Sequence, residues 1–295
     1  MTVQTNVEAP LPRIANVLSI AGSDPSGGAG VQADLKVFSA LGVYGMAALT
    51  ALTAQNTQGV AGVELLNPAF VARQIETVFA DIRVDAVKIG MLANADIVGA
   101  VAAVLAGQRE VPVILDPVMV AKGGAALLDD KAVGALVGQL LPQVRLITPN
   151  LPEAAALLRV AEAVDRSGME AQAKALLALG AKAVLLKGGH LPGDQSPDLL
   201  VTPTLTLWLE GKRIATANTH GTGCSLSSAI AAELAKAIDH GAIDHKATDS
   251  ATDDALAKAV TVAKAWLAGA VRSAGQLTVG SGHGPVHHFY QAWPK

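Results

Sequence analysis

Short apolar runs alternate along this chain with longer stretches in which apolar residues recur every three or four positions. The short runs predict strands at residues 14–21, 86–89, 113–115, 145–148 and 183–187. The longer stretches predict helices at residues 31–41, 67–82, 96–105, 133–141, 152–158, 168–179, 225–237 and 255–271. Apolar strands that alternate with amphipathic helices are typical of a mainly parallel sheet covered on both faces, so the pattern predicts an α/β fold.

Outside this alternation the pattern is less regular. Residues 44–52 form one more apolar run, and the runs 199–201 and 205–209 predict a β-ribbon, with Gly211 in the turn before 213–217. Residues 1–13 contain prolines and an acidic residue but no basic or apolar leader, so we expect a flexible tail before a single domain at 14–295. The polar stretch 239–254 is expected to form a surface loop or a helix extension.

Composition narrows the class of protein. With 51 % hydrophobic and 16 % charged residues, the 295-residue chain is too apolar to be disordered. A net charge of −3, from 22 basic and 25 acidic residues, gives no electrostatic reason to expect a nucleic-acid partner. The single cysteine excludes an internal disulfide and favours a reducing compartment. Because the apolar runs are shorter than the roughly 20 residues of a membrane span, we expect a cytoplasmic protein without a membrane partner.

The loop that follows the first predicted strand, Gly22–Gly30, is rich in glycine. Such a loop between a strand and a helix exposes backbone N–H groups and lets a ligand approach the chain closely. It is not a Walker A loop, because Gly28 stands where lysine is needed. Residues 28–33 match G-x-G-x-x-A, but no acidic residue lies between Asp34 and Glu64 to bind a dinucleotide ribose. A plain tight turn is the structural alternative to a ligand loop.

A second glycine-rich segment, Thr219–Ser225, directly precedes a predicted helix and contains the only cysteine, Cys224. Successive amides at a helix N-terminus form an anion site that the helix dipole supports. The same dipole would stabilise the Cys224 thiolate. The alternative is that Cys224 serves as a small buried hydrophobic residue.

Polar residues follow three further predicted strands. Asp116 and Lys187 each end a strand, and Asn150 and Glu153 stand three positions apart at the start of a helix. A lysine at a strand end can neutralise a transferring phosphate, and carboxylates there serve phosphate or metal chemistry. The structural alternatives are a capping box for Asn150 with Glu153 and a surface lysine for Lys187.

Other chemistry finds little support. The sequence has no H-E-x-x-H pair, no cysteine cluster and no G-x-S-x-G elbow, so zinc and esterase sites are not indicated. Three histidines, His283, His287 and His288, lie near the C-terminus. We expect them to serve turn and surface packing rather than metal binding.

Taken together, seven segments in this order resemble the ribokinase-like small-molecule kinases, and among them the hydroxymethylpyrimidine/phosphomethylpyrimidine kinases. These segments are residues 20–34, 50–57, 88–92, 115–119, 147–153, 187–190 and 220–224. The resemblance runs from about residue 14 to 288. It implies a three-layer αβα sandwich with a central, mostly parallel sheet, and a homodimer.

For the acceptor substrate, the resemblance implies a pyrimidine alcohol held by the Gly22 backbone, Asp34 and Gln55. Asp34 and Gln55 can between them accept from and donate to a 4-aminopyrimidine edge. Met91 is expected to pack on the ring, and Val118 to line the pocket.

For the phosphate donor, the resemblance implies ATP with Mg²⁺. Asn150 and Glu153 match the family's N-x-x-E element, in which Glu153 binds the metal through water. Asp116 and Lys187 are expected beside the triphosphate, with Asp116 also near the metal.

The segment before the last helices is expected to supply the catalytic anion hole. The resemblance assigns this role to Gly221, Thr222, Gly223 and Cys224, with Lys187 as a further catalytic residue. Most ribokinase-like kinases have an aspartate base where this chain has Cys224. A base role for Cys224 is therefore a hypothesis, since phosphoryl transfer depends more on positioning and charge.

The implied activity is ATP-dependent phosphorylation of 4-amino-5-hydroxymethyl-2-methylpyrimidine, and then of its monophosphate to the pyrophosphate, in thiamine biosynthesis. A vitamin B6 kinase on the same fold is the nearest alternative, although Gln55 and Met91 favour the pyrimidine. A non-catalytic sensor would not need the anion hole together with Lys187. An NAD-dependent oxidoreductase would need the acidic partner that the glycine-rich loop lacks.

Overall fold

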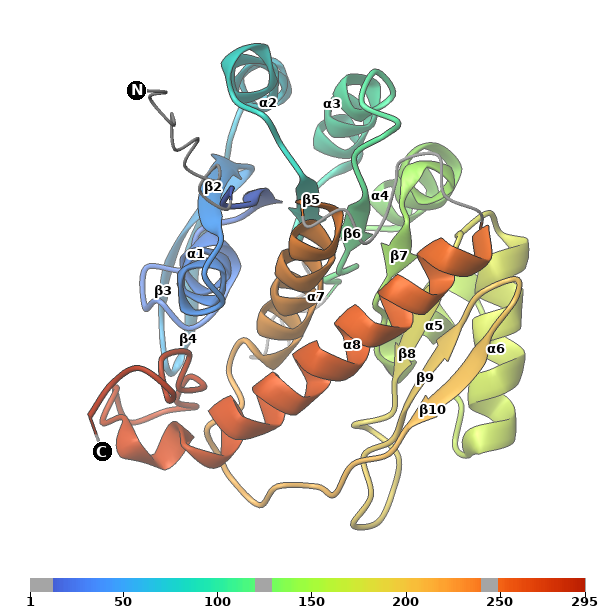
Figure 1. The fold of residues 1–295 in the computed structure, drawn as a ribbon. Helices are drawn as coiled ribbons and strands as arrows, with labels where there is room; N and C mark the ends of the chain where they lie inside the picture. The colour runs from blue at the N-terminus through green and yellow to red at the C-terminus, as the bar shows by residue number, and fades with distance from the viewer. Residues whose placement is uncertain (1–12, 120–128, 240–248, 295) are drawn as a thin grey trace, which may run out of the picture.

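An eight-stranded sheet forms the centre of the computed structural model, which describes residues 13–119, 129–239 and 249–294 (Figure 1). The strands lie in the order β10-β9-β8-β7-β6-β5-β1-β2. They are β1 Asn16–Ala21, β2 Tyr44–Leu49, β5 Ala86–Ile89, β6 Val113–Leu115, β7 Leu146–Ile147, β8 Val184–Lys187, β9 Asp198–Val201 and β10 Thr206–Leu209. The first six run parallel, while β9 and β10 each run antiparallel to their neighbour. The predicted, mostly parallel sheet is confirmed.

Helices cover both faces of this sheet, which gives the predicted three layers (Figure 1). One face carries α1 Gly30–Ala40, α7 Thr222–Asp239 and α8 Asp249–Arg272. The other carries α2 Pro68–Asp81, α3 Ala95–Leu105, α4 Asp130–Ala135, α5 Leu151–Leu158 and α6 Arg166–Ala178. Strand β5 shows why both layers form. Val87 and Ile89 pack into one apolar cluster and Ala86 into the other, because successive side chains point to opposite faces.

Side-chain caps fix where several helices begin. Asn67 caps α2 and precedes Pro68, whose missing N–H costs nothing in the first turn. Asn94 accepts from the amide of Ile97 at the start of α3, and Asp165 caps α6 in the same way. The helix predicted at 133–141 is instead α4, then a π-helical stretch at Leu136–Leu140 and a 3₁₀ turn at Leu141–Gln143.

Two predictions about strands are wrong. Residues 50–65, where only the end of an apolar run was expected, form a separate antiparallel hairpin of β3 Ala51–Asn56 and β4 Gly59–Leu65. The sequence pattern did not predict this hairpin, because β4 is largely exposed and mixes polar with apolar residues. Residues 213–217 form no strand, and Lys212 makes only an isolated bridge with Gln195. The β9–β10 ribbon itself is confirmed.

Two further predictions fall partly outside the described residues. The expected tail, 1–13, is described only at Arg13, so its flexibility stays a prediction. Of the polar stretch 239–254, residues 240–248 lie outside the description, and residues 249–254 begin α8 as a helix extension.

The strand order reverses at β1, and this reversal places the site. The chain passes from β1 to β2 on one side, then returns to β5 on the other side of β1. Ligands of open parallel sheets bind at the carboxyl ends of strands beside such a switch point. Gly22 and Gly90 follow β1 and β5 at this edge, and Asp116 and Lys187 mark the ends of β6 and β8.

Candidate active site

One large cavity of about 1580 Å³ lies at the carboxyl edge of the sheet. At one end it is lined by the glycine-rich loop after β1, by strand β3 and by Met91. At the other end it is lined by residues 207–214 around β10 and by one side of α8. Between these ends lie Asp116, Lys187 and the first turn of α7. The cavity therefore offers two compartments that meet at a charged centre.

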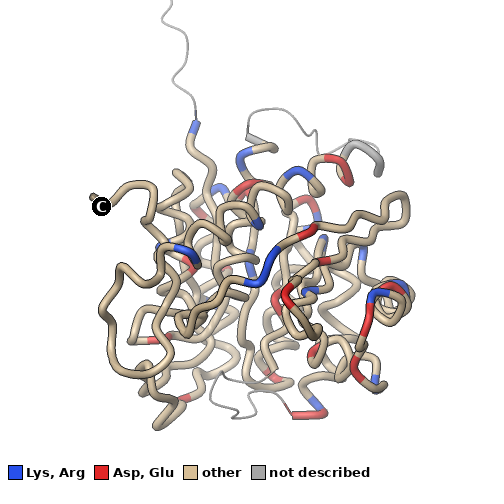
Figure 2. The backbone as a smooth tube through the Cα atoms, turned by 90° about the horizontal axis from the view of Figure 1, so that it is seen from below, with Lys and Arg blue, Asp and Glu red and all other residues tan. Residues whose placement is uncertain are grey.

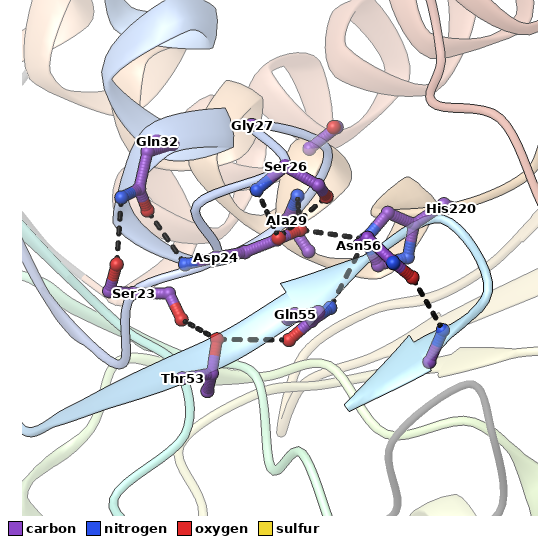
Figure 3. A network of polar contacts seen from close by, with 12 residues as sticks. Ser23, Asp24, Ser26, Gly27, Ala29, Gln32, Thr53, Gln55, Asn56 and His220 are labelled. Carbon is purple, nitrogen blue, oxygen red and sulfur yellow. Dashed lines mark hydrogen bonds and ion pairs between the residues drawn. The ribbon is translucent and has the colours of Figure 1, made fainter. Parts of the chain in front are cut away.

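Asp24 organises the glycine-rich loop (Figure 3). Its carboxylate accepts from the Ser26 amide at 2.9 Å, the Ser26 hydroxyl at 2.6 Å and the Ala29 amide at 2.8 Å. His220 Nε2 lies 2.7 Å from Asp24 Oδ2. Burial alone would raise the pKa of Asp24, but the hydrogen bonds from His220 and Ser26 outweigh it and lower the pKa to about 2. Asp24 is therefore ionised and joins the loop to the start of α7.

Gln55 lies on β3 and points toward the same cluster (Figure 3). Thr53 Oγ1 lies 2.9 Å from the carbonyl oxygen of Ser23 and 3.2 Å from Gln55 Oε1. Gln55 Nε2 lies 3.5 Å from His220 Nε2. The Gln32 amide group bridges the Asp24 amide and the Ser23 hydroxyl, which fixes the loop against α1. Gln55 thus lines the cavity as the sequence predicted, in a network that the sequence did not reveal.

Three other predicted substrate residues also lie at this end. Gly22, Met91 and Val118 all line the cavity. A Cβ at Gly22 would collide with the Met91 methyl group, so glycine is what lets Met91 lie across the loop. An apolar thioether and a valine side chain beside an amide form a surface that suits a flat, polar-edged ring.

The sequence predicted Asp34 as a substrate ligand, but the structure buries this residue and it does not line the cavity. The side chain is fully buried and forms an ion pair with Lys88 at 2.8 Å. Ser19 and Ser228 donate to the same carboxylate at 2.6 and 2.7 Å. Burial would lower the pKa of Lys88, but Asp34 outweighs it and raises that pKa. The pair joins the sheet to α1 and α7 beneath the site.

A second ion pair faces the cavity. Lys187 Nζ lies 2.9 Å from Asp116 Oδ1 and 3.8 Å from Glu153 Oε2. Thr148 donates to the same Asp116 oxygen at 3.1 Å. Burial would lower the pKa of Lys187, but Asp116 and Glu153 outweigh it and raise that pKa. The alternative of a surface lysine is therefore wrong, because the Lys187 side chain is only 15 % exposed.

Asn150 and Glu153 form the capping box that was the structural alternative for this pair. Glu153 N donates to Asn150 Oδ1 at 2.8 Å, and Asn150 N donates to Glu153 Oε2 at 2.7 Å. Both residues nevertheless line the cavity. Burial raises the pKa of Glu153 to about 7, with Lys187 opposing the rise and Asp116 adding to it. The capping role holds Glu153 in place beside Lys187.

The first turn of α7 meets this charged centre. Gly221 has a φ of +76°, which favours glycine, and a Cβ there would collide with the Gly28 carbonyl of the first loop. A Cβ at Gly223 would stand 3.3 Å from Asp116 Oδ2 and 3.4 Å from Lys187 Nζ. Gly221, Thr222, Gly223 and Cys224 all line the cavity. The two glycine-rich segments therefore pack together, which the sequence alone could not show.

The expected stabilised thiolate is not what the structure supports. Burial raises the pKa of Cys224 to about 11, against the opposing effect of Lys88 and of a hydrogen bond from the Gly30 amide. Asp34 and Asp116 add to the rise. Cys224 is therefore a neutral thiol near pH 7.

The chemistry of the donor set fits Mg²⁺. This ion keeps several waters and binds through one or two carboxylates together with substrate phosphates. Asp116 and Glu153 supply two carboxylates beside Lys187, and Asp116 Oδ2 faces the start of α7. Within 13–119, 129–239 and 249–294, no three His, Cys, Asp or Glu residues converge on a metal position. The two carboxylates thus suit a metal that a phosphate-bearing ligand also binds.

The C-terminal segment supports the site from outside. His220 N donates to the Gly284 carbonyl at 3.1 Å, and Ser225 Oγ lies 3.1 Å from His288 Nε2. His287 and His288 are buried rather than on the surface. Burial, with Lys36 and His287 nearby, lowers the pKa of His288 to about 3, so this ring is neutral.

Sequence reasoning assigned no role to several cavity residues. Asp24 and His220 lie inside the glycine-rich motifs, and the signal that could have marked them is a charged residue next to a ligand loop. Trp208, Lys264 and Asp198 line the β10–α8 end: Lys264 pairs with Asp198 at 2.6 Å, and Arg166, from outside the cavity, lies 4.6 Å from the centre of the Trp208 ring. These residues lack any motif, because only the fold brings β9, β10 and α8 together.

Basic and acidic positions are interspersed along the tube (Figure 2). No helix among the described residues is long and apolar enough to cross a membrane.

Comparison with known proteins places this geometry in a family. A sequence profile described as phosphomethylpyrimidine kinase matches residues 24–287. The chain is 52 % identical to the hydroxymethylpyrimidine/phosphomethylpyrimidine kinase of Salmonella typhimurium over 278 residues, which cover 94 % of this chain and 98 % of that protein. Among solved structures it resembles an ADP complex of Bacillus subtilis pyridoxal kinase (TM-score 0.80, 34 % identity, 95 % and 99 % covered). It also resembles a phosphomethylpyrimidine kinase from Clostridium difficile (TM-score 0.72, 38 % identity, 86 % and 98 % covered).

Proposed function

The chain belongs to the phosphomethylpyrimidine kinase family, and we propose that it phosphorylates 4-amino-5-hydroxymethyl-2-methylpyrimidine with ATP in thiamine biosynthesis. We further propose that it converts the resulting monophosphate to the pyrophosphate. The observation that carries this proposal is the charged centre of Asp116, Lys187 and Glu153, which faces the first turn of α7 between two compartments. A γ-phosphoryl group in transfer is stabilised by a cationic side chain at this centre and by carboxylates that can hold a metal ion.

The acceptor binds at the end formed by the glycine-rich loop and β3. The Gly22 backbone and the Gln55 amide hold the polar edge of the pyrimidine, while Met91 and Val118 contact the ring faces. Of these groups, the two side chains at the ring faces are apolar, and the Gln55 amide is itself hydrogen-bonded. Such a surface fixes the orientation of a ring more strictly than it adds binding energy.

ATP binds at the end formed by β10 and α8, with its phosphates at the charged centre. The amides of Gly221–Cys224 receive negative charge at the N-terminus of α7, which the helix dipole favours. Lys187 neutralises charge on the transferring group, and Asn150 holds Glu153 in place through the capping box. Mg²⁺ would be held by Asp116 and, through water, by Glu153, and would supply further charge neutralisation at the phosphates.

In the transfer step the substrate hydroxyl oxygen forms a bond to the γ-phosphorus as the bond to the β-phosphate oxygen breaks. The hydroxyl proton passes to an oxygen of the transferred phosphoryl group, because Cys224, which lines the cavity beside Gly223, already carries its own proton. Because the raised pKa keeps this thiol protonated beforehand, proton removal is late and charge stabilisation carries most of the rate. The second phosphorylation uses the same amides and Lys187, with a phosphate oxygen as the attacking group.

Steady-state kinetics of the purified chain test the proposal. ATP consumption is measured with the pyrimidine alcohol, with its monophosphate and with pyridoxal, each in the presence and absence of Mg²⁺. We expect turnover of both pyrimidines and a kcat/KM for the alcohol at least tenfold above that for pyridoxal, about 1.4 kcal/mol. A tenfold advantage for pyridoxal would contradict the proposal, and so would ATP turnover that ignores all three acceptors.

Pyridoxal kinase activity is the second candidate, because a pyridoxal kinase shares the fold at TM-score 0.80. The higher identity to a hydroxymethylpyrimidine/phosphomethylpyrimidine kinase, 52 % against 34 %, favours the pyrimidine. Gln55 adds to this, since an amide pairs well with an aminopyrimidine edge.

We also propose a single catalytic domain over residues 14–295, a cytoplasmic location and a homodimer. Support for the homodimer comes from large apolar side chains that are exposed on β2, the β3–β4 hairpin and α2. They are Tyr44, Leu52, Val63, Leu65 and Phe70. Surfaces of this kind favour burial against a second copy. Light scattering on the eluted protein should give a mass of about 60 kDa, twice the 29.9 kDa of one chain.

A further inference from the structure

Asp24 determines which ring nitrogen of His220 carries a proton. Two amides and two side chains approach the Asp24 carboxylate, namely Ser26 twice, Ala29 and His220. An ionised carboxylate only accepts hydrogen bonds. The proton in the 2.7 Å contact therefore belongs to His220, and its Nε2 is an N–H donor. This atom cannot also accept a hydrogen bond from Gln55.

Thr53 sets a second constraint on Gln55. The Thr53 hydroxyl has one proton, and the Ser23 carbonyl oxygen at 2.9 Å can only accept it. Thr53 Oγ1 then presents lone pairs to the Gln55 amide, 3.2 Å away. The end of the amide that faces Thr53 is best matched when it is the NH₂ group.

Both constraints select the same orientation of the Gln55 amide. They reject the one with Oε1 beside Thr53 and Nε2 beside His220, because the oxygen then meets lone pairs and the NH₂ meets an N–H. A half-turn of the amide exchanges the two ends and changes no shape. The NH₂ then donates to Thr53, and the carbonyl oxygen lies beside the His220 N–H.

We propose that Thr53 and His220 are positioning residues that hold the Gln55 carbonyl oxygen toward the substrate, so that the site selects a ring with an N–H donor there. This inference rests on the proposed function. The oxygen retains a lone pair for the amino group next to the hydroxymethyl carbon of the aminopyrimidine. A ring that has a carbonyl oxygen at that position, such as pyridoxal with its aldehyde, would meet acceptor against acceptor. Discrimination of this kind is strong when buried polar groups are otherwise left unpaired.

The test compares the 4-amino pyrimidine alcohol with its 4-oxo analogue, in which an acceptor oxygen replaces the amino group and a ring nitrogen gains a proton. Dissociation constants are measured by calorimetry without ATP, and kcat/KM with it, for the wild-type chain, Thr53→Val and Thr53→Ser. Valine keeps the branched shape but loses the hydroxyl, whereas serine keeps the hydroxyl. We expect the wild-type chain to bind the amine at least tenfold more tightly than the 4-oxo analogue.

In Thr53→Val we expect this preference to fall about fivefold, the effect of one neutral hydrogen bond. In Thr53→Ser we expect it to stay within twofold of the wild-type value. The inference is overturned if the wild-type chain binds both ligands equally or prefers the 4-oxo ring, or if the valine and serine variants discriminate alike. Failure of the proposed function looks different, because the wild-type chain would then transfer no phosphate to either pyrimidine.

Discussion

Two aspartate–lysine pairs lie at the same edge of the sheet, and they differ in what surrounds them. Asp34 with Lys88 is fully buried, and Ser19 and Ser228 complete the hydrogen bonds of the carboxylate. Asp116 with Lys187 opens to the cavity, and Lys187 has the more distant Glu153 as its second carboxylate, at 3.8 Å.

The difference separates a structural pair from a catalytic one. A buried ion pair whose partners are all supplied by the protein has no capacity left for a ligand, and removing one partner leaves an uncompensated charge. A pair at a cavity wall that has a long contact, such as the 3.8 Å from Lys187 to Glu153, can exchange that contact for one with a phosphate. The residue types are the same in both pairs, and the saturation of their hydrogen bonds is what separates a structural pair from a catalytic one.

Removing Lys88 should give the largest effect, and it should act on stability. In Lys88→Met the Asp34 carboxylate stays buried without its cation, at an expected cost of about 3–5 kcal/mol in the free energy of unfolding. Urea unfolding followed by circular dichroism measures this. In the double variant Lys88→Met with Asp34→Leu, we expect at least half of the loss to be recovered, because the uncompensated charge is gone. If Lys88→Met alone unfolds like the wild-type chain, the pair is not the structural element described.

Removing Lys187 should act on catalysis instead. We expect Lys187→Met to lower kcat about 10²–10³-fold, the effect of removing one preorganised charge from a transition state. The free energy of unfolding should fall by less than in Lys88→Met, because the Lys187 side chain is 15 % exposed at the cavity, whereas Lys88 and Asp34 are completely buried. Lys182→Met, an exposed lysine just before the same strand, is the matched control and should keep the wild-type kcat. A kcat for Lys187→Met within threefold of the wild-type value would remove Lys187 from the catalytic centre.

The contrast between the pairs also shows what sequence could predict. The alternation of apolar runs predicted the parallel sheet and most helices, because burial on both faces determines that pattern. The glycine-rich loops predicted where ligands approach, and Gln55, Met91 and Lys187 do line the cavity. Asp34 was misplaced because its position on a helix does not reveal that Lys88 of β5 lies against it. The β3–β4 hairpin that carries Gln55 was missed because its exposed face lacks a clear apolar alternation.

Charged residues of both pairs act on the pKa of the Cys224 thiol, so the reactivity of this thiol also tests the comparison. Lys88 favours the thiolate, while Asp34 and Asp116 oppose it, and burial raises the pKa of the thiol to about 11. For an acid whose pKa is raised, the reactive anion appears only as the pH approaches that value. We therefore expect the rate of alkylation by iodoacetamide to rise tenfold per pH unit from pH 7 to 9.5.

At pH 7.5 the same rate should be about 100-fold below that of a cysteine peptide, whose thiol has a pKa near 9. Because the chain has one cysteine, mass spectrometry counts the label at a single position, and Cys224→Ser should take up none. A plateau in the rate below pH 8 would mean a stabilised thiolate, and would restore Cys224 as a base ready before substrate binds. A continuous rise would mean that burial, rather than the N-terminus of α7, governs this thiol, and that Cys224 still carries its own proton when phosphoryl transfer begins.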